Sequence, residues 1–494
     1  MERENNSFCN SSKNKIPLSF EIKRGERAAV EACERRESAG VPSTTTATRA
    51  ESNLEKFCIN NAQMVRKKCI MDYGKFMTEI SKRRKPNLIR QLTEAYMKNP
   101  DALFFAGGLP NPQMFPFKEI SVTYSGGTRM KLENKDLVSA LQYGQTQGHP
   151  PLLKKWRELQ SKWHSPPYSE WDVHFVTGSM DGCSKIFELL IEEGSPVMLQ
   201  TPTYTGILGA AMPMQPHIVP IEMDEDGVLP EDISKACEER LKSGKPLPKF
   251  LYVNPTGANP VGTVYSNERK EEIYKLAQKY DFLILEDDAY YFLHFLDEQP
   301  RSFLSLDVDG RVLRLDSFSK ILSAGIRLGV VTGPKPLLQK IGLHLACSTL
   351  HPSSLSQVLV CKLLEAWSDD DLSAHFAEIR RFYRDKRDLM LKVVEKHFTG
   401  IAEWSAPKGG MFLWMKVSVM EDVYDLVMNT CVPQGVFVLP GHAFYVEGTS
   451  KPCPYLRICY SQAQPDDVEE GLAKLAALIR QVAKKGDEPV INGA

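Results

Sequence analysis

The sequence predicts an α/β protein with a mostly parallel central sheet flanked by helices, followed by a smaller α+β domain. Short apolar runs alternate with helical stretches between residues 171 and 332, and strands joined through helices pair in parallel by right-handed crossovers. After Pro336, two long helical stretches follow each other without an intervening strand. A chain of 494 residues has room for at least two such domains.

The composition is that of an ordinary globular protein and argues against several functional classes. The formal net charge is -1, with 42% hydrophobic and 25% charged residues, so neither nucleic-acid binding nor a membrane partner is expected. No apolar run approaches the ~20 residues of a membrane-spanning helix. The 11 cysteines form no C-x-x-C pair and the 10 histidines no H-E-x-x-H motif. Neither a metal site nor a disulfide framework is therefore predicted, and a reducing compartment is favoured.

The N-terminal region, residues 1–70, differs from the rest of the chain. It has few large apolar residues, a Ser/Thr run at 43–48 and mixed charges, which predicts a disordered extension. Transit peptides are poor in acidic residues, so a targeting peptide and a folded protein that starts at Met71 both remain open. The expected domains are an arm at 71–115, a large domain at 116–345, a small domain at 346–485 and a tail at 486–494.

The apolar pattern assigns the elements in order. In the first part, helices are expected at 86–98, 137–143, 184–191, after Tyr204 and at 267–280. Strands are expected there at 103–112, broken by glycines and prolines, and at 173–177, 196–200, 217–221, 250–253, 282–286, 312–315 and 328–332. In the second part, helices are expected at 355–367, 372–397, near 423–430 and at 465–484, and extended apolar segments at 411–416, 436–439 and 455–460.

Helix 267–280 has the clearest signals. Ser266 or Asn267 can cap its N-terminus, and glutamates occupy its first turn. Ile273, Ala277 and Tyr280 recur at helical spacing and form one apolar face.

Polar residues follow four of the predicted strands, at 178–182, 254–262, 286–291 and 317–320. Ligands bind at the carboxyl ends of strands in open α/β sheets. Lys320 lies just beyond a buried strand and near Arg327, where a lysine loses basicity and can form a Schiff base. Each motif alone has a simpler explanation: a surface lysine, an ordinary Pro/Gly connection or a solvated acidic loop.

Together, the four motifs predict a site for a planar, phosphorylated heteroaromatic aldehyde. Lys320 would hold the aldehyde as an imine, and Asp287 would keep the ring nitrogen protonated. Asn259 and Tyr290 would donate to the ring oxygen. The phosphate would lie at the glycine-containing turn before a helix, with further donors from Ser179, Ser317, Ser319 and Arg327.

The ordered motifs A-G-G-L-P-N, T-G-S, N-P-x-G-x-N-P-x-G, E-D-D-A-Y-Y and S-F-S-K-I-x-x-x-G-I-R-L-G resemble the fold-type-I, class I/II pyridoxal-phosphate aminotransferases. Within these enzymes, the sequence is most similar to the kynurenine/α-aminoadipate aminotransferase group. The resemblance covers about residues 71–484. It implies a fold-type-I transferase with pyridoxal 5'-phosphate, a ping-pong mechanism, and transfer from L-2-aminoadipate, L-kynurenine or other L-amino acids to 2-oxoglutarate or another 2-oxo acid. It also implies a homodimer with the active site at the subunit interface, and a mitochondrial location, with a cytoplasmic one as the alternative.

The resemblance also implies a role for each matching residue. Lys320 forms the Schiff base and shuttles the proton during transfer, Asp287 binds the pyridinium nitrogen, and Tyr204 stacks on the ring. The phosphate is bound by Ser179, Met180 (through its backbone amide), Ser317, Ser319 and Arg327, joined by Tyr143 of the partner subunit.

Arg457 is expected to bind the substrate α-carboxylate. Arg90, Gly108, Asn259 and Tyr143 are expected to contact the substrate as well. From the residues alone, Arg457 could equally be an outward-facing arginine on a strand. Two departures from the family pattern stand out: Val261 in the N-P-V-G turn, and Met180-Asp181, where a carboxylate would oppose the phosphate charge unless it points away or caps the helix.

Two other functions fit the same cofactor fold. A lyase or decarboxylase would use the same ring chemistry, but a residue that binds the α-carboxylate argues against its loss. A transcription regulator that carries this fold would need a DNA-binding module, and residues 1–70 contain no credible helix-turn-helix.

Overall fold

The computed structural model describes residues 71–99, 101–125 and 127–486. The predicted extension at 1–70 and the tail from 487 onward lie outside the described residues. All described residues belong to one compact unit.

An eight-stranded sheet forms the centre of the fold, in the order β3-β10-β9-β8-β7-β4-β5-β6. Its strands are β3 (Trp171–Val176), β4 (Pro196–Thr201), β5 (His217–Asp224), β6 (Gly227–Val228), β7 (Phe250–Val253), β8 (Leu283–Asp287), β9 (Val312–Ser317) and β10 (Gly329–Pro334). Only β6 and β10 run antiparallel to the others, so the prediction of a mostly parallel sheet is confirmed.

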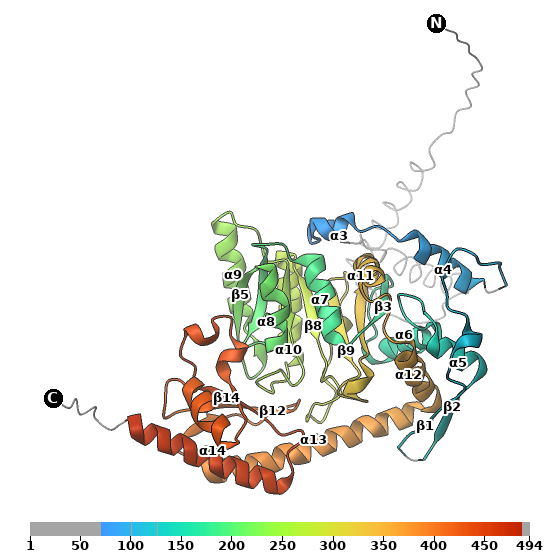
Figure 1. Ribbon diagram of the computed structural model, residues 1–494. Helices are drawn as coiled ribbons and strands as arrows, with labels where there is room; N and C mark the ends of the chain where they lie inside the picture. Colours follow the sequence, from blue (N-terminus) through green and yellow to red (C-terminus); the bar gives the residue numbers. More distant parts are fainter. Residues whose placement is uncertain (1–70, 100, 126, 487–494) are drawn as a thin grey trace, which may run out of the picture. The chain divides into compact units, whose positions relative to one another are not determined.

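Helices cover both faces of this sheet (Figure 1). Because successive strand residues point to opposite faces, Tyr252 of β7 packs with α7 (Ser179–Leu190), α8 (Thr205–Ala211) and α11 (Lys335–Ser348). Its neighbours Leu251 and Val253 pack with α9 (Pro230–Lys242) and α10 (Asn267–Tyr280) on the other face. The α10 bounds match the prediction, and Ser266 caps this helix by accepting from the Arg269 backbone N–H.

A third group of helices packs around the β3 end of the sheet. The helices α6 (Pro150–His164), α12 (Ser354–Ala366) and the start of α13 (Asp369–Phe398) share a core with Phe175 and Phe318. The N-terminal segment adds α3 (Glu79–Arg83), α4 (Leu88–Lys98), the hairpin β1 (Ile120–Thr123) and β2 (Arg129–Leu132), and α5 (Asn134–Leu141).

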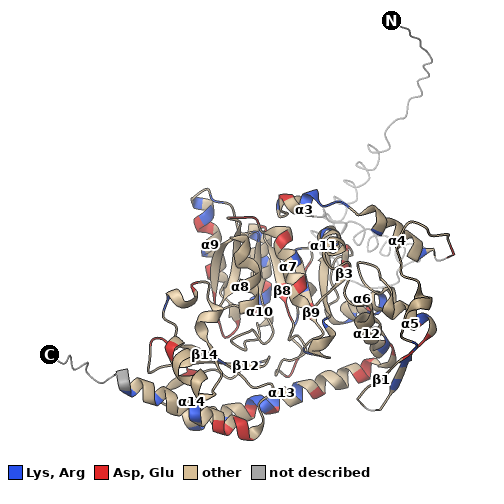
Figure 2. Cartoon of the chain, in the orientation of Figure 1, with Lys and Arg blue, Asp and Glu red and all other residues tan. Residues whose placement is uncertain are grey.

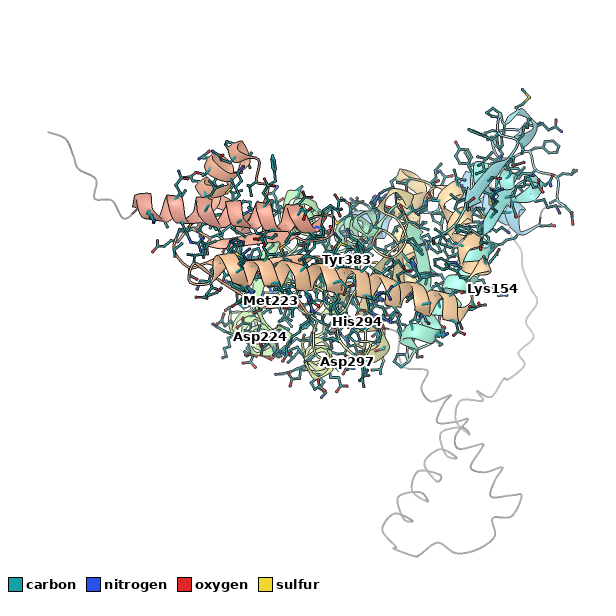
Figure 3. The ribbon with its side chains drawn as sticks, turned by 90° about the horizontal axis from the view of Figure 1, so that it is seen from below. Lys154, Met223, Asp224, His294, Asp297 and Tyr383 are labelled. Carbon is teal, nitrogen blue, oxygen red and sulfur yellow. The ribbon has the colours of Figure 1, made fainter. Side chains whose placement is uncertain are left out.

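The C-terminal part contains a second, antiparallel sheet in the order β11-β12-β14-β13. Its strands are β11 (Ala402–Trp404), β12 (Phe412–Val417), β13 (Leu439–Pro440) and β14 (Tyr455–Cys459). One face of this sheet packs on α13 and α14 (Pro465–Gly486), which lie side by side in Figure 3. The opposite face carries Phe412, Trp414, Arg457 and Cys459. Both acidic and basic residues occur along α13 and α14 (Figure 2).

Three predicted elements are wrong or shortened. Residues 103–112 form no strand, because no neighbouring strand pairs with them. The helix expected near 423–430 is a π-helix at Leu426–Cys431. Of the segment expected at 436–439, only Leu439 lies in a strand, β13 (Leu439–Pro440). The helices α6, α9 and α11 and the β1–β2 hairpin were not predicted.

None of the described helices is long and apolar enough to span a membrane. Among the same residues, no group of three or more His, Cys, Asp or Glu side chains is arranged to hold a metal ion.

Candidate active site at the carboxyl edge of the sheet

The predicted site residues follow strands that end at one edge of the central sheet. Asp287, the last residue of β8, pairs in register with Leu315 of β9. Ser317, the last residue of β9, pairs with Gly329 of β10, which also pairs with Val176 at the end of β3. The turns that begin at Thr177, Asp288 and Phe318 therefore leave the sheet at the same edge, the Asp288 turn two residues before the other two.

Asp287 is a buried carboxylate that is held by one oxygen and free at the other. Its Oδ2 accepts a 2.7 Å hydrogen bond from the Tyr252 hydroxyl, and Asn254 Nδ2 donates to its backbone carbonyl at 2.5 Å. Among the described residues, its buried Oδ1 has no hydrogen-bond partner. Burial raises the pKa of Asp287 to about 6, although the Tyr252 hydrogen bond opposes this shift. The free oxygen is positioned to accept an N–H from a ligand.

The carboxylates on either side of Asp287 point to the other face of the sheet. Asp288 and Glu286 contact the fully buried Arg314 at 2.9 and 3.2 Å. Asp316 of the next strand contacts the same guanidinium at 2.9 Å. Glu286 and Asp288 thus share the Arg314 guanidinium, which leaves Asp287 as the one of the three consecutive acidic residues without a cation partner in the described part of the chain.

Lys320 lies in the turn after β9, with its Nζ 5.8 Å from the centroid of the Tyr290 ring. No carboxylate among the described residues forms an ion pair with it. Burial lowers the pKa of Lys320, and the positive charges of Arg327 and Arg457 act in the same direction. A larger fraction of the amine is therefore neutral and nucleophilic near neutral pH than for an exposed lysine.

An anion-binding site lies at the start of α7. Ser179 and Met180 open this helix, so their backbone N–H groups have no acceptor within it, and the helix dipole favours a negative charge there. Arg327 packs against Gly178, where a Cβ atom would overlap the guanidinium. The same guanidinium donates to Ser319 Oγ at 3.3 Å. Two features that bind phosphate thus converge beside the Lys320 turn.

Asp181 does not oppose this anion site. Its Oδ2 accepts from the Thr177 backbone N–H at 2.9 Å, and its Oδ1 contacts Lys185 Nζ at 3.0 Å. Lys185 thus neutralises the carboxylate, which binds the backbone N–H of the residue before Gly178 and makes no cap hydrogen bond to α7. Of the two alternatives left open by the sequence, capping is therefore not observed.

Arg457 faces the cluster from β14. Its guanidinium lies 4.2 Å from the ring centroid of Phe412 and 5.2 Å from that of Phe444, and it donates to Asn259 Oδ1 at 3.0 Å. In the described part of the chain, no carboxylate neutralises it. Because Asn259 accepts with its oxygen, its amide nitrogen remains as a donor. The alternative of an outward-facing arginine does not hold.

The two tyrosines lie near the same carboxylate. Tyr290 is buried, and its ring meets Phe412 edge-on at 6.2 Å. Tyr204 stands at the N-terminus of α8 with its ring over Gly206. Burial, and secondarily the charge of Asp287, raises the pKa of both hydroxyls, so both remain neutral donors.

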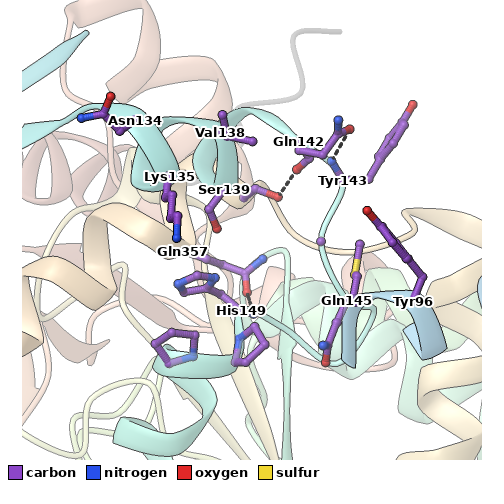
Figure 4. Close-up of a pocket in the computed structure, with 15 residues that line it drawn as sticks. Tyr96, Asn134, Lys135, Val138, Ser139, Gln142, Tyr143, Gln145, His149 and Gln357 are labelled. Carbon is purple, nitrogen blue, oxygen red and sulfur yellow. Dashed lines mark hydrogen bonds between the residues drawn. The ribbon is translucent and has the colours of Figure 1, made fainter. Parts of the chain in front are cut away.

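The remaining predicted residues form a separate group on the N-terminal segment. Arg90 donates to the Gly144 carbonyl and the Thr146 hydroxyl at 2.9 and 2.8 Å. Tyr143 borders a cavity of about 790 Å³ between α4, α5 and α12 (Figure 4), and Gly108 is exposed. None of the described contacts of these residues reaches Lys320 or Asp287.

The residues at the sheet edge fit the cofactor inferred from the sequence. The site combines a phosphate-binding helix end, a nucleophilic amine and one unpartnered buried carboxylate oxygen, which match the phosphate, aldehyde and ring nitrogen of pyridoxal phosphate. Sequence reasoning missed Tyr252, Asn254, Phe412 and Phe444. Asn254 stands within the N-P-x-G-x-N-P-x-G motif, whereas Tyr252 looks like one more residue of an apolar strand.

The fold and these side chains define a fold-type-I pyridoxal-phosphate enzyme. The sequence pattern of the aminotransferase class I and II family matches residues 128–475, and the chain belongs to this family. It is a pyridoxal-phosphate-dependent aminotransferase, and the substrates of such enzymes are amino acids and 2-oxo acids.

Individual relatives are similar over most of the chain. The mitochondrial kynurenine/alpha-aminoadipate aminotransferase of Bos taurus is 40% identical over 83% of this chain and 100% of its own length. The crystal structure of aminotransferase Aro8 from Candida albicans has a TM-score of 0.75 at 29% identity, covering 84% of this chain and 99% of that one. The alpha-aminoadipate aminotransferase LysN from Thermus thermophilus, complexed with N-(5'-phosphopyridoxyl)-L-leucine, has a TM-score of 0.62 at 26% identity, covering 84% of this chain and 100% of that one.

Proposed function

We propose that this aminotransferase transfers the amino group of L-2-aminoadipate, L-kynurenine and related L-amino acids to 2-oxoglutarate or another 2-oxo acid. The names of the Bos taurus and Thermus thermophilus relatives support this substrate class. The observation that carries the proposal is a set of charges that no described residue neutralises. They are the Lys320 amine and the Asp287 carboxylate at the carboxyl edge of the central sheet, and the Arg457 guanidinium, which faces them from β14.

Each of these groups has a distinct role in the proposal. Bound pyridoxal phosphate supplies a ring that accepts the electron pair released from the substrate Cα. Asp287 Oδ1 would accept the ring N–H and balance its charge. Lys320 would take the proton from the substrate Cα and deliver it to the C4′ carbon of the cofactor. Asn259 and Tyr290 would donate to the ring oxygen, and Tyr204 would lie over the ring.

The phosphate is assigned to the start of α7. The backbone amides of Ser179 and Met180 and the side chains of Ser179, Ser317, Ser319 and Arg327 would donate to it. Fixing this dianion sets the distance between the cofactor and Lys320. Because transferred groups react only in a narrow range of positions, this anchor contributes to rate as well as to affinity.

Arg457 is assigned to the substrate α-carboxylate. The guanidinium lies near two aromatic rings, and its planar N–H groups suit bidentate binding of a carboxylate. Retention of that carboxylate distinguishes transamination from decarboxylation.

We further propose a homodimer in which the N-terminal segment of each chain covers the other. Its support is the concentration of exposed apolar side chains there: Leu103 and Phe105 are 89% and 92% exposed, and Leu88, Ile89, Met114 and Phe117 are exposed as well. Patches of this kind mark protein interfaces. Tyr143, Arg90 and Gly108 would then contact the phosphate and substrate of the neighbouring subunit's site. Sedimentation of the full chain measures the subunit number.

A mitochondrial location, suggested by the name of the Bos taurus relative, and the domain boundaries at 115 and 345 remain proposals. Fluorescence microscopy of the full chain and of a chain that starts at Met71 tests the first. Retained import without residues 1–70 would contradict a targeting role for them.

The decisive experiment on substrates is a profile of amino donors with 2-oxoglutarate as the acceptor. We expect L-2-aminoadipate and L-kynurenine to give the highest kcat/KM. Release of CO₂, or return of the cofactor to its aldehyde form without an acceptor, would contradict transamination.

A further inference from the structure

The Asp287 carboxylate is held by a hydrogen bond from Tyr252, a residue that has no role in the proposed function. Tyr252 is the third residue of β7 and is completely buried between β8 and α7. It pairs in register with Leu285, two residues before Asp287 on the same face of β8. Its long side chain reaches the carboxyl edge and donates to Asp287 Oδ2 at 2.7 Å.

This hydrogen bond fixes the orientation of the carboxylate plane, with one oxygen occupied and the other left for the ligand. A carboxylate rotates freely about its last torsion unless a partner fixes it. With Oδ2 held by Tyr252, Oδ1 is left without a partner among the described residues. Asn254, which follows β7, fixes the Asp287 backbone through its carbonyl at 2.5 Å. Both hydrogen bonds to Asp287 therefore come from β7 and the residue that follows it.

The hydrogen bond also favours the charged form of the carboxylate. Burial raises the pKa of Asp287, and the Tyr252 donor is the largest contribution that opposes the shift. Burial together with the charge of Asp287 raises the pKa of Tyr252 itself well above its usual range, so the phenol remains a neutral donor.

We propose that Tyr252 is a positioning residue for the cofactor: by donating to Asp287 Oδ2, it aims Oδ1 at the ring nitrogen and keeps the carboxylate charged. This inference rests on the proposed role of Asp287. It predicts that the phenol acts only through the carboxylate.

The test compares Tyr252→Phe with a matched control, Tyr274→Phe. Tyr274 is also buried, and its hydroxyl donates to Asp309 at 2.6 Å and to Asp307 at 3.0 Å, on the other face of the sheet. We measure the dissociation constant of pyridoxal phosphate by titrating the apoenzyme, together with the pH dependence of the visible spectrum of the holoenzyme.

Loss of a hydrogen bond to a charged group should raise the Tyr252→Phe dissociation constant by about tenfold or more. Its spectral transition should also shift, because the carboxylate becomes less acidic. Tyr274→Phe should change apoenzyme stability alone. An unchanged dissociation constant and spectrum in Tyr252→Phe would overturn the inference.

A double-mutant cycle separates this inference from the assignment of Asp287. In an Asp287→Ala background, Tyr252→Phe should produce no further loss of cofactor affinity. A full additional loss there would overturn the proposal that Tyr252 acts through the carboxylate. If Asp287→Ala itself retained wild-type affinity and turnover, the assignment of Asp287 would fail instead.

Discussion

Charged residues on the two faces of the central sheet differ in their ion pairs with residues of opposite charge. On the α9 and α10 side, Glu286, Asp288 and Asp316 surround the buried Arg314 within 3.2 Å. On the α7 and α8 side, Asp287 has no cation within ion-pair distance among the described residues, and Lys320 and Arg457 have no carboxylate. Burying a charge without a partner is costly, so the charges on the α7 and α8 side are candidates for pairing with a ligand.

The difference lies in orientation, since the residue types are the same. Glu286, Asp287 and Asp288 are consecutive, and alternation along the strand directs the middle side chain to the ligand face and its neighbours to the core. Glu286 and Asp288 are therefore bound to Arg314 inside the protein, and Asp287 is left for the cofactor. Matched substitutions on the two faces test this distinction.

The largest difference is expected between two lysines. Lys320→Ala should lower kcat by about 10⁴-fold, because the proton shuttle is lost, with little change in folding. Lys270, buried on the other face, donates to the Arg301 carbonyl at 2.7 Å, so Lys270→Met should retain turnover per folded molecule. Steady-state kinetics with a saturating cofactor concentration measures both. Equal loss of turnover in the two variants would contradict the distinction.

The adjacent carboxylates provide the closest matched pair. Asp287→Asn should lower kcat/KM by about 10²–10³-fold, since it removes a preorganised charge at the reacting ring. Asp288→Asn should lower the free energy of unfolding by about 1–3 kcal/mol, because it weakens a buried hydrogen bond to Arg314, and should leave kcat close to wild type. Kinetics and urea denaturation of both variants distinguish the two roles, and an exchange of phenotypes would refute this assignment.

Burial of the Asp287 carboxylate should make the stability of the apoenzyme depend on pH. Its pKa rises from 3.8 to about 6 on folding, so its contribution to stability is fully present below 3.8 and is lost as the pH rises through about 6. Apo Asp287→Asn should therefore gain stability relative to wild type over this interval, by at most about 3 kcal/mol. Urea denaturation at several pH values measures the gain. A constant difference would argue that the carboxylate is compensated.

The smallest difference in activity is expected between substitutions of two arginines. Arg457→Gln should raise the KM for the amino acid by about 10–100-fold, from the loss of a charged hydrogen bond, with folding nearly unchanged. Arg314→Met should instead destabilise the protein by about 3–5 kcal/mol, because it leaves buried carboxylates unpaired. Thermal unfolding and substrate titration distinguish them. A KM effect confined to Arg314→Met would reverse the assignment.

Much of this site could be predicted from sequence because its residues stand directly after short apolar strands, at 287, 320 and 179. The contacts between those strands could not be predicted. Arg457 and Asn259 are 198 positions apart, and only the register of two separate sheets brings them together. Tyr252 and Arg314 were missed because a polar residue inside an apolar strand gives no sign of its partner.

In the N-terminal segment, by contrast, the sequence predicted an element that does not form. Its apolar residues at 103–105 suggested a strand, yet apolar character alone does not make a strand without a neighbour to share its hydrogen bonds. Leu103 and Phe105 are exposed in the single chain, which is consistent with the proposed subunit interface.

The most direct test of the central claim locates the lysine that holds the cofactor. Borohydride reduction of the holoenzyme fixes the cofactor to its lysine as a stable secondary amine, and peptide mass spectrometry then identifies the modified residue. The account predicts a phosphopyridoxyl group on Lys320, and none in a parallel digest of Lys320→Ala. A label on a different lysine of the wild-type holoenzyme would contradict it.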